Sequence, residues 1–121
     1  MATIDFRDLF AGAGKRPGMY GIDDRYRSAV AYVEGCDAAT GYELLEGMSE
    51  WLDGKIYDRE GRGSVAWWGL VVTRRFPHLG SGKWSFTPEQ EALLTNDLWA
   101  VLDEFLADRP HTFNVARAPS D

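Results

Sequence analysis

Four acidic residues are the side chains whose types and spacing could do chemistry. Projected onto a helix at about 100° per residue, they fall on one face; this acidic strip consists of Glu43, Glu46, Glu50 and Asp53. Three carboxylates at such spacing could bind a metal ion, but helix-borne carboxylate sites draw further ligands from other helices. The chain has no Glu-x-x-His motif. We therefore interpret the strip as a face turned to water or to a binding partner, and we expect no metal site.

No catalytic motif joins the thiol and the imidazoles of the chain. Cys36 is the single cysteine, so no internal disulfide can form, and its apolar neighbours favour a small buried side chain. His78 falls in a loop, where an isolated histidine is usually a surface residue. The glycine-rich loop that contains Lys83 lacks the spacing of a phosphate-binding loop. We expect a protein without a catalytic set and without a cofactor.

Composition and charge narrow the class of partner. The 121 residues, of which 45% are hydrophobic, are enough for one domain with its own core. The net charge of −6 argues against nucleic acid, which requires clustered positive charge, and suits a protein with a basic surface. The chain has no apolar run of membrane-spanning length and no signal-peptide pattern. We expect a cytoplasmic protein that binds neither nucleic acid nor membranes.

A Lys-Arg-Pro-Gly-Met-Tyr string near the start predicts a structural turn between two helices. Pro17 fixes its own φ and pushes Arg16 out of the α region, so a helix arriving from the N-terminal side has to end there. Pro-Gly fits the central positions of a type II turn, which places Gly18 at positive φ. Met19 and Tyr20 are then expected to anchor the turn to the core.

The helix before this turn is predicted to begin after Thr3 as its N-cap and to end at Gly12 and Gly14. Its apolar residues recur at helical spacing: Phe6, Leu9, Phe10 and Ala13.

Two further helices are predicted after the turn. The first begins after Asp23 or Asp24 and ends near Gly35, with one apolar face formed by Tyr26, Ala29, Val30 and Val33. Asp37 is interpreted as the cap of the next helix. That helix contains the acidic strip, and its opposite face is apolar: Leu44, Leu45, Met48, Trp51 and Leu52.

Residues 64–76 allow two interpretations. Their β-branched and aromatic side chains suit a buried strand. Ser64 as an N-cap and two arginines at the exit favour a helix, and so does a shared helical face that contains Val65, Trp68, Val72 and Phe76.

The last helix has the clearest start signal in the chain. Thr87 suits the N-cap, Pro88 the first helical position, and Gln90 the third position of a capping box. The helix is expected to end before Pro110, with one apolar side formed by Leu94, Leu98, Val101, Leu102 and Phe105 and with Leu93 and Leu106 at its margins. The fold prediction is thus a mainly α, single-domain bundle of about five helices over residues 1–108, with residues 109–121 as an extended or disordered tail.

Most of the chain resembles a group of small bacterial proteins. Their shared features are Arg-Pro-Gly-Met-Tyr near the start, a helix ending in Gly, a Leu-x-Gly-Met-x-x-Trp-Leu segment, an apolar segment with Ser and Trp, and a final helix with Leu-x-Glu-Phe. The matching residues here are 16–20, Gly35, Leu45, Gly47, Met48, Trp51, Leu52, Ser64, Trp67 or Trp68, Leu102, Glu104 and Phe105. Gly21 precedes Ile22, where that group commonly has the reverse order.

The same string also resembles the N-terminal region of the gyrase B type of ATPase, but this likeness covers only residues 15–21. The nucleotide site of that family needs an Asn and an acidic group on the following helix. Residues 28–40 offer Glu34 and Asp37 but no Asn. The Asp-x-Gly-x-Gly stretch is absent too, so we interpret the likeness as a shared turn sequence.

The first resemblance implies a non-catalytic function, because proteins of that type are similar to immunity and accessory proteins that lie beside bacterial toxin genes and bind a cognate protein. The expected partner is then a protein, such as a toxin, with a basic surface. The expected contact residues are Glu43, Glu46, Glu50, Asp53, Asp58, Glu60 and Trp84. The alternative is a small accessory domain that binds a small molecule in an aromatic pocket lined by Trp51, Trp67, Trp68 and Trp84.

Overall fold

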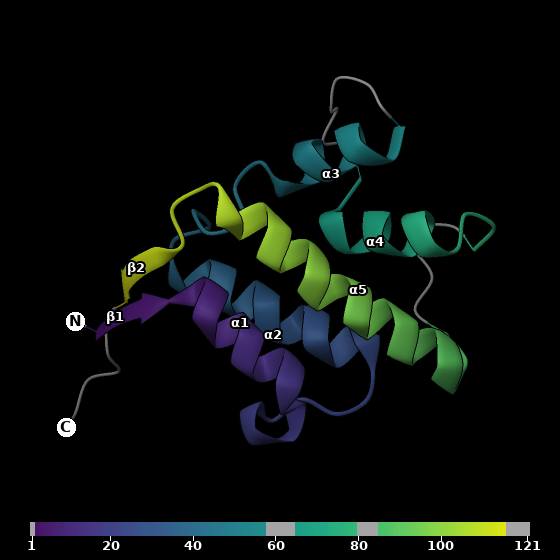
Figure 1. The fold of residues 1–121 in the computed structure, drawn as a ribbon, viewed down its shortest axis with the longest axis horizontal. Helices are drawn as coiled ribbons and strands as arrows, with labels where there is room; N and C mark the ends of the chain where they lie inside the picture. Colours follow the sequence, from purple (N-terminus) through teal and green to yellow (C-terminus); the bar gives the residue numbers. More distant parts are fainter. Residues whose placement is uncertain (1, 58–64, 80–84, 116–121) are drawn as a thin grey trace.

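A computed structural model describes residues 2–57, 65–79 and 85–115. Five α-helices, one 3₁₀ helix and two short strands occur in these ranges. In chain order they are β1 (Ala2–Asp5), α1 (Phe6–Lys15), η1 (Pro17–Tyr20), α2 (Tyr26–Ala39), α3 (Met48–Tyr57), α4 (Trp67–Arg75), α5 (Pro88–Ala107) and β2 (Thr112–Val115). Figure 1 shows α5 between α1 on one side and the α3–α4 pair on the other. The predicted mainly α single domain of about five helices is confirmed.

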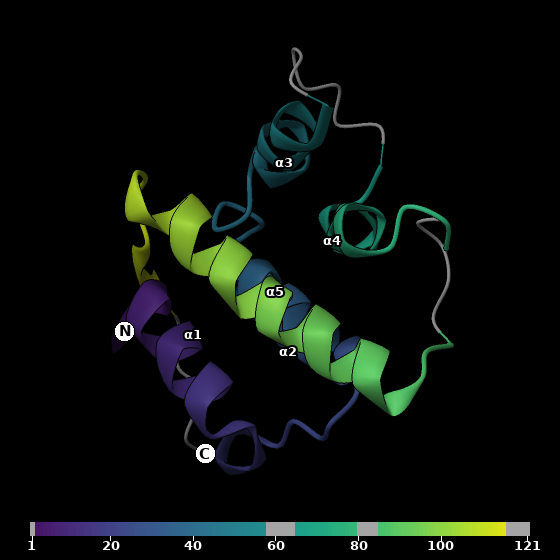
Figure 2. The same cartoon turned by 45° about the vertical axis from the view of Figure 1, so that its right-hand side comes forward.

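α5 is the helix against which most others pack. Its N-terminus has the predicted capping box, because Gln90 N donates to Thr87 Oγ1 at 3.2 Å and Thr87 N donates to Gln90 Oε1 at 2.9 Å. α1, α2 and α4 contact α5, and α3 packs on α4; Figure 2 shows α1 and α4 on opposite sides of it. The predicted end before Pro110 and the predicted apolar face are confirmed, and Leu106 is also buried.

The chain begins with a strand rather than a helix. β1 pairs antiparallel with β2, with Ala2 opposite Val115 and Ile4 opposite Phe113. Asp5, not Thr3, is the N-cap of α1, since its side chain accepts a hydrogen bond from Asp8 N. The predicted tail therefore belongs to the fold as far as Val115, and only a partner distant in sequence could reveal the strand.

α1 continues through both glycines to Lys15, so the predicted end at Gly12 was wrong. These positions are small because other side chains approach them. A Cβ on Gly12 would lie 2.5 Å from the Tyr20 hydroxyl, and one on Gly14 would lie 3.1 Å from Trp99 Cγ. The glycines allow helix packing here and do not end the helix.

The Pro-Gly segment forms the 3₁₀ helix η1 instead of a type II turn. The fixed φ of Pro17 suits the first position of a short helix equally well. The positive φ is found one turn later, at Gly21 with 73°, and Ile22 N then donates to the carbonyl of Pro17 at 3.0 Å. Met19 is 74% exposed, so it is not the predicted anchor, whereas Tyr20 packs against the core.

α2 is longer than predicted and takes its cap from another helix. It begins at Tyr26 and passes through Gly35, and Asp37 lies in its last turn instead of starting a new helix. Arg25 at the N-cap makes no side-chain capping bond. Glu91 Oε2 on α5 accepts from Tyr26 N at 2.5 Å. The predicted apolar face of α2 is confirmed as buried: Tyr26, Ala29, Val30 and Val33.

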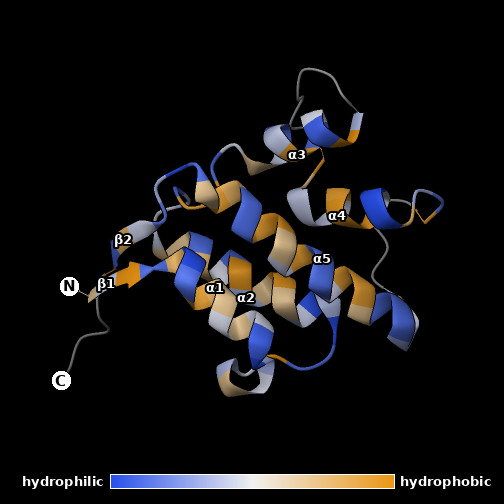
Figure 3. Ribbon diagram, viewed as in Figure 1, coloured by the Kyte–Doolittle hydropathy of each residue, from blue (hydrophilic) through white to orange (hydrophobic). Residues whose placement is uncertain are grey.

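Residues 67–75 are helical, which confirms the favoured interpretation of that segment. α4 has Ala66 as its N-cap, and Ser64 lies outside the described residues. It is buried on more than one side because it packs against both α3 and α5. Figure 3 shows its hydrophobic part in the middle and its hydrophilic part at the C-terminal end. No described helix combines the length and the apolar character needed to cross a membrane.

Candidate partner-binding surface

The acidic strip is not a helical face. Glu43 and Glu46 lie in the turn of residues 40–47, which we call the acidic turn, while Glu50 lies in the first turn of α3. All three are exposed. Asp53 is only 2% exposed, so its assignment to the surface was wrong. α3 begins only at Met48, and the helical frame assumed from residue 43 therefore does not apply. Asp58, Glu60 and Trp84 lie outside the described residues.

Two buried leucines and the end of α2 hold the acidic turn from inside. Leu44 is fully buried and Leu45 is 7% exposed. Leu45 N donates to Asp37 Oδ1 at 3.0 Å, and Leu44 N donates to Thr40 Oγ1 at 3.0 Å. The carboxylate of Asp37 is thus used to cap the turn, which explains why an acid is buried there.

Arg109 closes the acidic turn from the other side. Its guanidinium donates to the carbonyl oxygens of Glu43, at 3.0 Å, and Glu46. The same guanidinium lies over the ring of Phe105, 4.6 Å from the ring centroid. Hydrogen bonds from a charged donor are stronger than neutral ones, so the residue just beyond α5 fixes the backbone of a turn far away in sequence.

Tyr42 is the exposed aromatic residue of the acidic turn. It is 68% exposed, and with φ of 67° it is the single non-glycine residue at positive φ in the described part of the chain. An L-residue pays about 1–2 kcal/mol for this conformation. Its backbone N donates to the carbonyl of Asp37 at 2.9 Å. The network around the turn therefore holds a strained residue with its ring turned outward.

The outer side of the acidic turn presents the Tyr42 ring together with unpaired negative charges. Within the described ranges, no hydrogen bond or ion pair engages the carboxylates of Glu43, Glu46 or Glu50. Carboxylates without an ion-pair partner attract a positively charged surface over about a Debye length, roughly 8–10 Å. The arrangement can therefore attract and steer a positively charged partner.

The thiol of Cys36 and the imidazole of His111 are both held within the fold. Burial raises the pKa of Cys36 to about 11, so its thiol stays protonated at neutral pH. His111 Nδ1 lies 2.8 Å and 2.9 Å from the carbonyl oxygens of Leu106 and Arg109; since carbonyls only accept, this nitrogen is the donor. In residues 2–57, 65–79 and 85–115, no three His, Cys, Asp or Glu side chains are arranged to hold a metal ion.

The described tryptophans of the predicted aromatic pocket are Trp51, Trp67 and Trp68. Trp67 is buried and donates to Glu34 Oε1 at 2.9 Å, and Trp68 packs against the core. Trp51 lies beside Phe105, with 5.2 Å between ring centroids. Trp84 is outside the described residues. Trp67 and Trp51 therefore contact different helices, α2 and α5 respectively.

Tyr42 and Arg109 were missed by sequence reasoning. Positive φ at a tyrosine has no sequence signal; Gly41 beside it is a residue type that often follows the end of a helix, but it was not used in this way. Arg109 acts across 66 residues on Glu43, and nothing near it in the sequence indicates that contact. Comparisons with known protein families, curated proteins and solved structures gave no match.

Proposed function

We propose that this is a non-catalytic binding protein, similar in function to an immunity protein, which neutralises or escorts a cognate protein in the bacterial cytoplasm. One observation supports it above others. The side chain of Tyr42 is 68% exposed and lies in the acidic turn beside Glu43 and Glu46. Hydrogen bonds to Arg109 and Asp37 hold the backbone of that turn.

The physical basis is preorganisation. A loop that is already fixed loses little conformational entropy on binding, so more of the contact energy appears as affinity. Tyrosine is enriched among residues that dominate binding energy. The free carboxylates around it favour a partner with a basic surface and accelerate association with it. A strained residue at an exposed position is costly to the fold, and a binding role accounts for that cost.

The partner can be captured with a photo-reactive amino acid. Benzoylphenylalanine is placed at Tyr42 and, as a matched control, at Leu93, which is 41% exposed on α5. After irradiation in cells of the source organism, we expect one protein adduct at position 42 that is absent at position 93 and is suppressed by high salt. The captured protein should have a basic surface. Equal adducts at both positions would contradict the proposal.

A further inference from the structure

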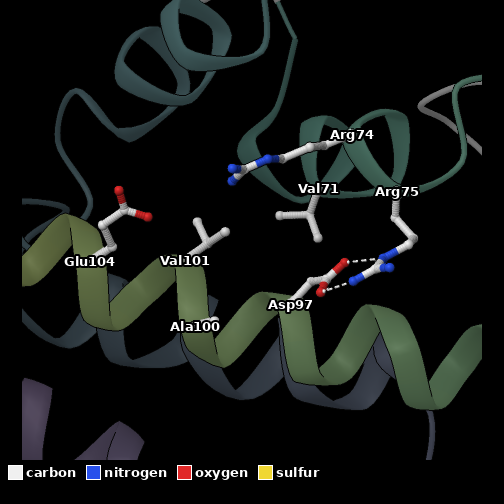
Figure 4. A pocket seen from close by; sticks show the side chains of 7 residues that line it. All are labelled: Val71, Arg74, Arg75, Asp97, Ala100, Val101 and Glu104. Atoms are coloured by element: carbon white, nitrogen blue, oxygen red, sulfur yellow. Dashed lines mark hydrogen bonds and ion pairs between the residues drawn. The ribbon is translucent and has the colours of Figure 1, made fainter.

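A pocket, which we call the notch, lies between α4 and α5 on the side of the molecule that faces α3. Its volume is about 390 Å³, and Figure 4 shows the side chains around it. The floor is apolar and consists of Val71, Ala100 and Val101, whereas the rim is charged and consists of Arg74, Arg75, Asp97 and Glu104. This volume is within the range of small-ligand sites, which combine apolar walls with a few polar groups.

Both carboxylates on the rim are already paired. Arg75 donates to Asp97 through Nε and Nη2, each at 2.7 Å. Glu104 forms an ion pair with Lys55 from α3. Three cationic and two anionic side chains therefore meet here, and one positive charge is left over. The chain as a whole carries a net charge of −6, so this charge is a local exception.

Arg74 supplies the uncompensated charge. In the part of the chain that the structure describes, its guanidinium makes no hydrogen bond and no ion pair. Figure 4 shows its side chain extended across the opening above Val101 in the direction of Glu104, while Arg75 turns away toward Asp97. A free guanidinium thus lies over an apolar floor.

We infer that the notch binds a carboxylate with a short aliphatic chain. The planar fork of Arg74 matches the two oxygens of a carboxylate, and the aliphatic part can lie against the apolar lining of Val71, Ala100 and Val101. Arg74 lies in the last turn of α4, where the helix dipole disfavours negative charge; this cost is larger for a phosphate dianion than for a carboxylate with its single charge. A cation finds no free carboxylate pair. The notch and the acidic turn share no residues, so this inference does not depend on the proposed function.

A carboxylate of this kind can belong to a free organic acid or to the C-terminus of a protein chain. Two probes separate these sources: pentanoate, and the tripeptide Gly-Gly-Val with its C-terminal amide as control. Each is titrated into the isotope-labelled protein of 121 residues, and the amide shifts of Val71, Ala100 and Val101 are followed by NMR. Pentanol and inorganic phosphate show whether the carboxylate and its single charge are required.

The inference predicts saturable shifts with pentanoate, with the tripeptide acid, or with both, and much weaker effects from pentanol, phosphate and the amide. Arg74→Gln should weaken binding roughly tenfold or more, because it removes a charged hydrogen-bond donor. Arg16→Gln makes the same charge change at an exposed site outside the notch and should leave binding unchanged. The inference is overturned if no probe saturates up to tens of millimolar, if pentanol matches pentanoate, or if Arg74→Gln binds as tightly as the wild type.

Discussion

Arg109 donates a hydrogen bond of 3.0 Å to the carbonyl oxygen of Glu43, which precedes it by 66 residues. Through this contact, the end of the central helix α5 determines the shape of the acidic turn. Tyr42, beside Glu43, is held at positive φ in the same turn. The shape of the proposed binding surface therefore depends on the fold and not on a local sequence motif.

Replacing Arg109 tests this dependence. Arg109→Ala removes two hydrogen bonds to backbone carbonyls and a stacking contact with Phe105, so we expect the free energy of unfolding to fall by about 2 kcal/mol. Urea denaturation measures this free energy of unfolding for the variant and the wild type. Arg16→Ala removes an exposed arginine and should change stability by less than about 0.5 kcal/mol. Equal effects of the two substitutions would show that Arg109 does not hold the turn.

Tyr42 is expected to cost stability and to provide binding. Tyr42→Asn should raise the free energy of unfolding by up to about 1 kcal/mol, because Asn tolerates positive φ and the lost ring is mostly exposed. Tyr42→Ala removes the ring but keeps the strain, so it should be less stable than the Asn variant. Both variants should bind the partner more weakly. An Asn variant that is less stable than the Ala variant would contradict this account of the turn.

Gly35 lies inside α2, although its type suggested a helix end. A Cβ added there meets no atom within 4 Å, so Gly35→Ala should stabilise the protein by about 1 kcal/mol through helix propensity. Gly41, at φ of 67°, is the matched control, and Gly41→Ala should destabilise by about 1 kcal/mol. Thermal unfolding of both variants distinguishes the positions. A loss of stability at position 35 would mean that α2 ends where the sequence suggested.

Glu34 should make stability depend on pH. Burial raises the pKa of Glu34 above its ordinary value of 4.5, and the hydrogen bond from Trp67 opposes this only in part. The folded protein therefore holds this proton more tightly than the unfolded chain does, so stability decreases as pH rises through the window above 4.5.

Glu34→Gln removes the charge but keeps an oxygen that can accept from Trp67. We expect this variant to be more stable than the wild type at neutral pH and to lose the advantage as pH falls below the ordinary Glu pKa of 4.5. Denaturation series at several pH values measure the stability difference between the variant and the wild type, with Glu50→Gln on the exposed surface as control. An advantage independent of pH would show that the charge of Glu34 is not responsible.

The sequence was sufficient for features whose causes are local. The capping box before α5 and the apolar periodicity of α2 were both predicted, since each depends on neighbours within one or two helical turns. The strand pairing of Ile4 with Phe113, the approach of Trp99 to Gly14 and the contact of Arg109 with Glu43 depend on residues distant in the chain. The burial of Asp53 was also missed, although Asp53 lies in the same helix as the exposed Glu50.

The most direct test is the association rate constant with the captured partner. Glu43→Lys combined with Glu46→Lys should lower this constant roughly tenfold at low salt and flatten its salt dependence. The control is Asp24→Lys combined with Glu89→Lys, which changes the net charge by the same amount. Both residues are exposed and lie near the N-terminal ends of α2 and α5, whereas the acidic turn follows the C-terminal end of α2. This control should leave the association rate constant within about twofold of the wild-type value. Equal rate constants for the two double variants would contradict a binding role for the acidic turn.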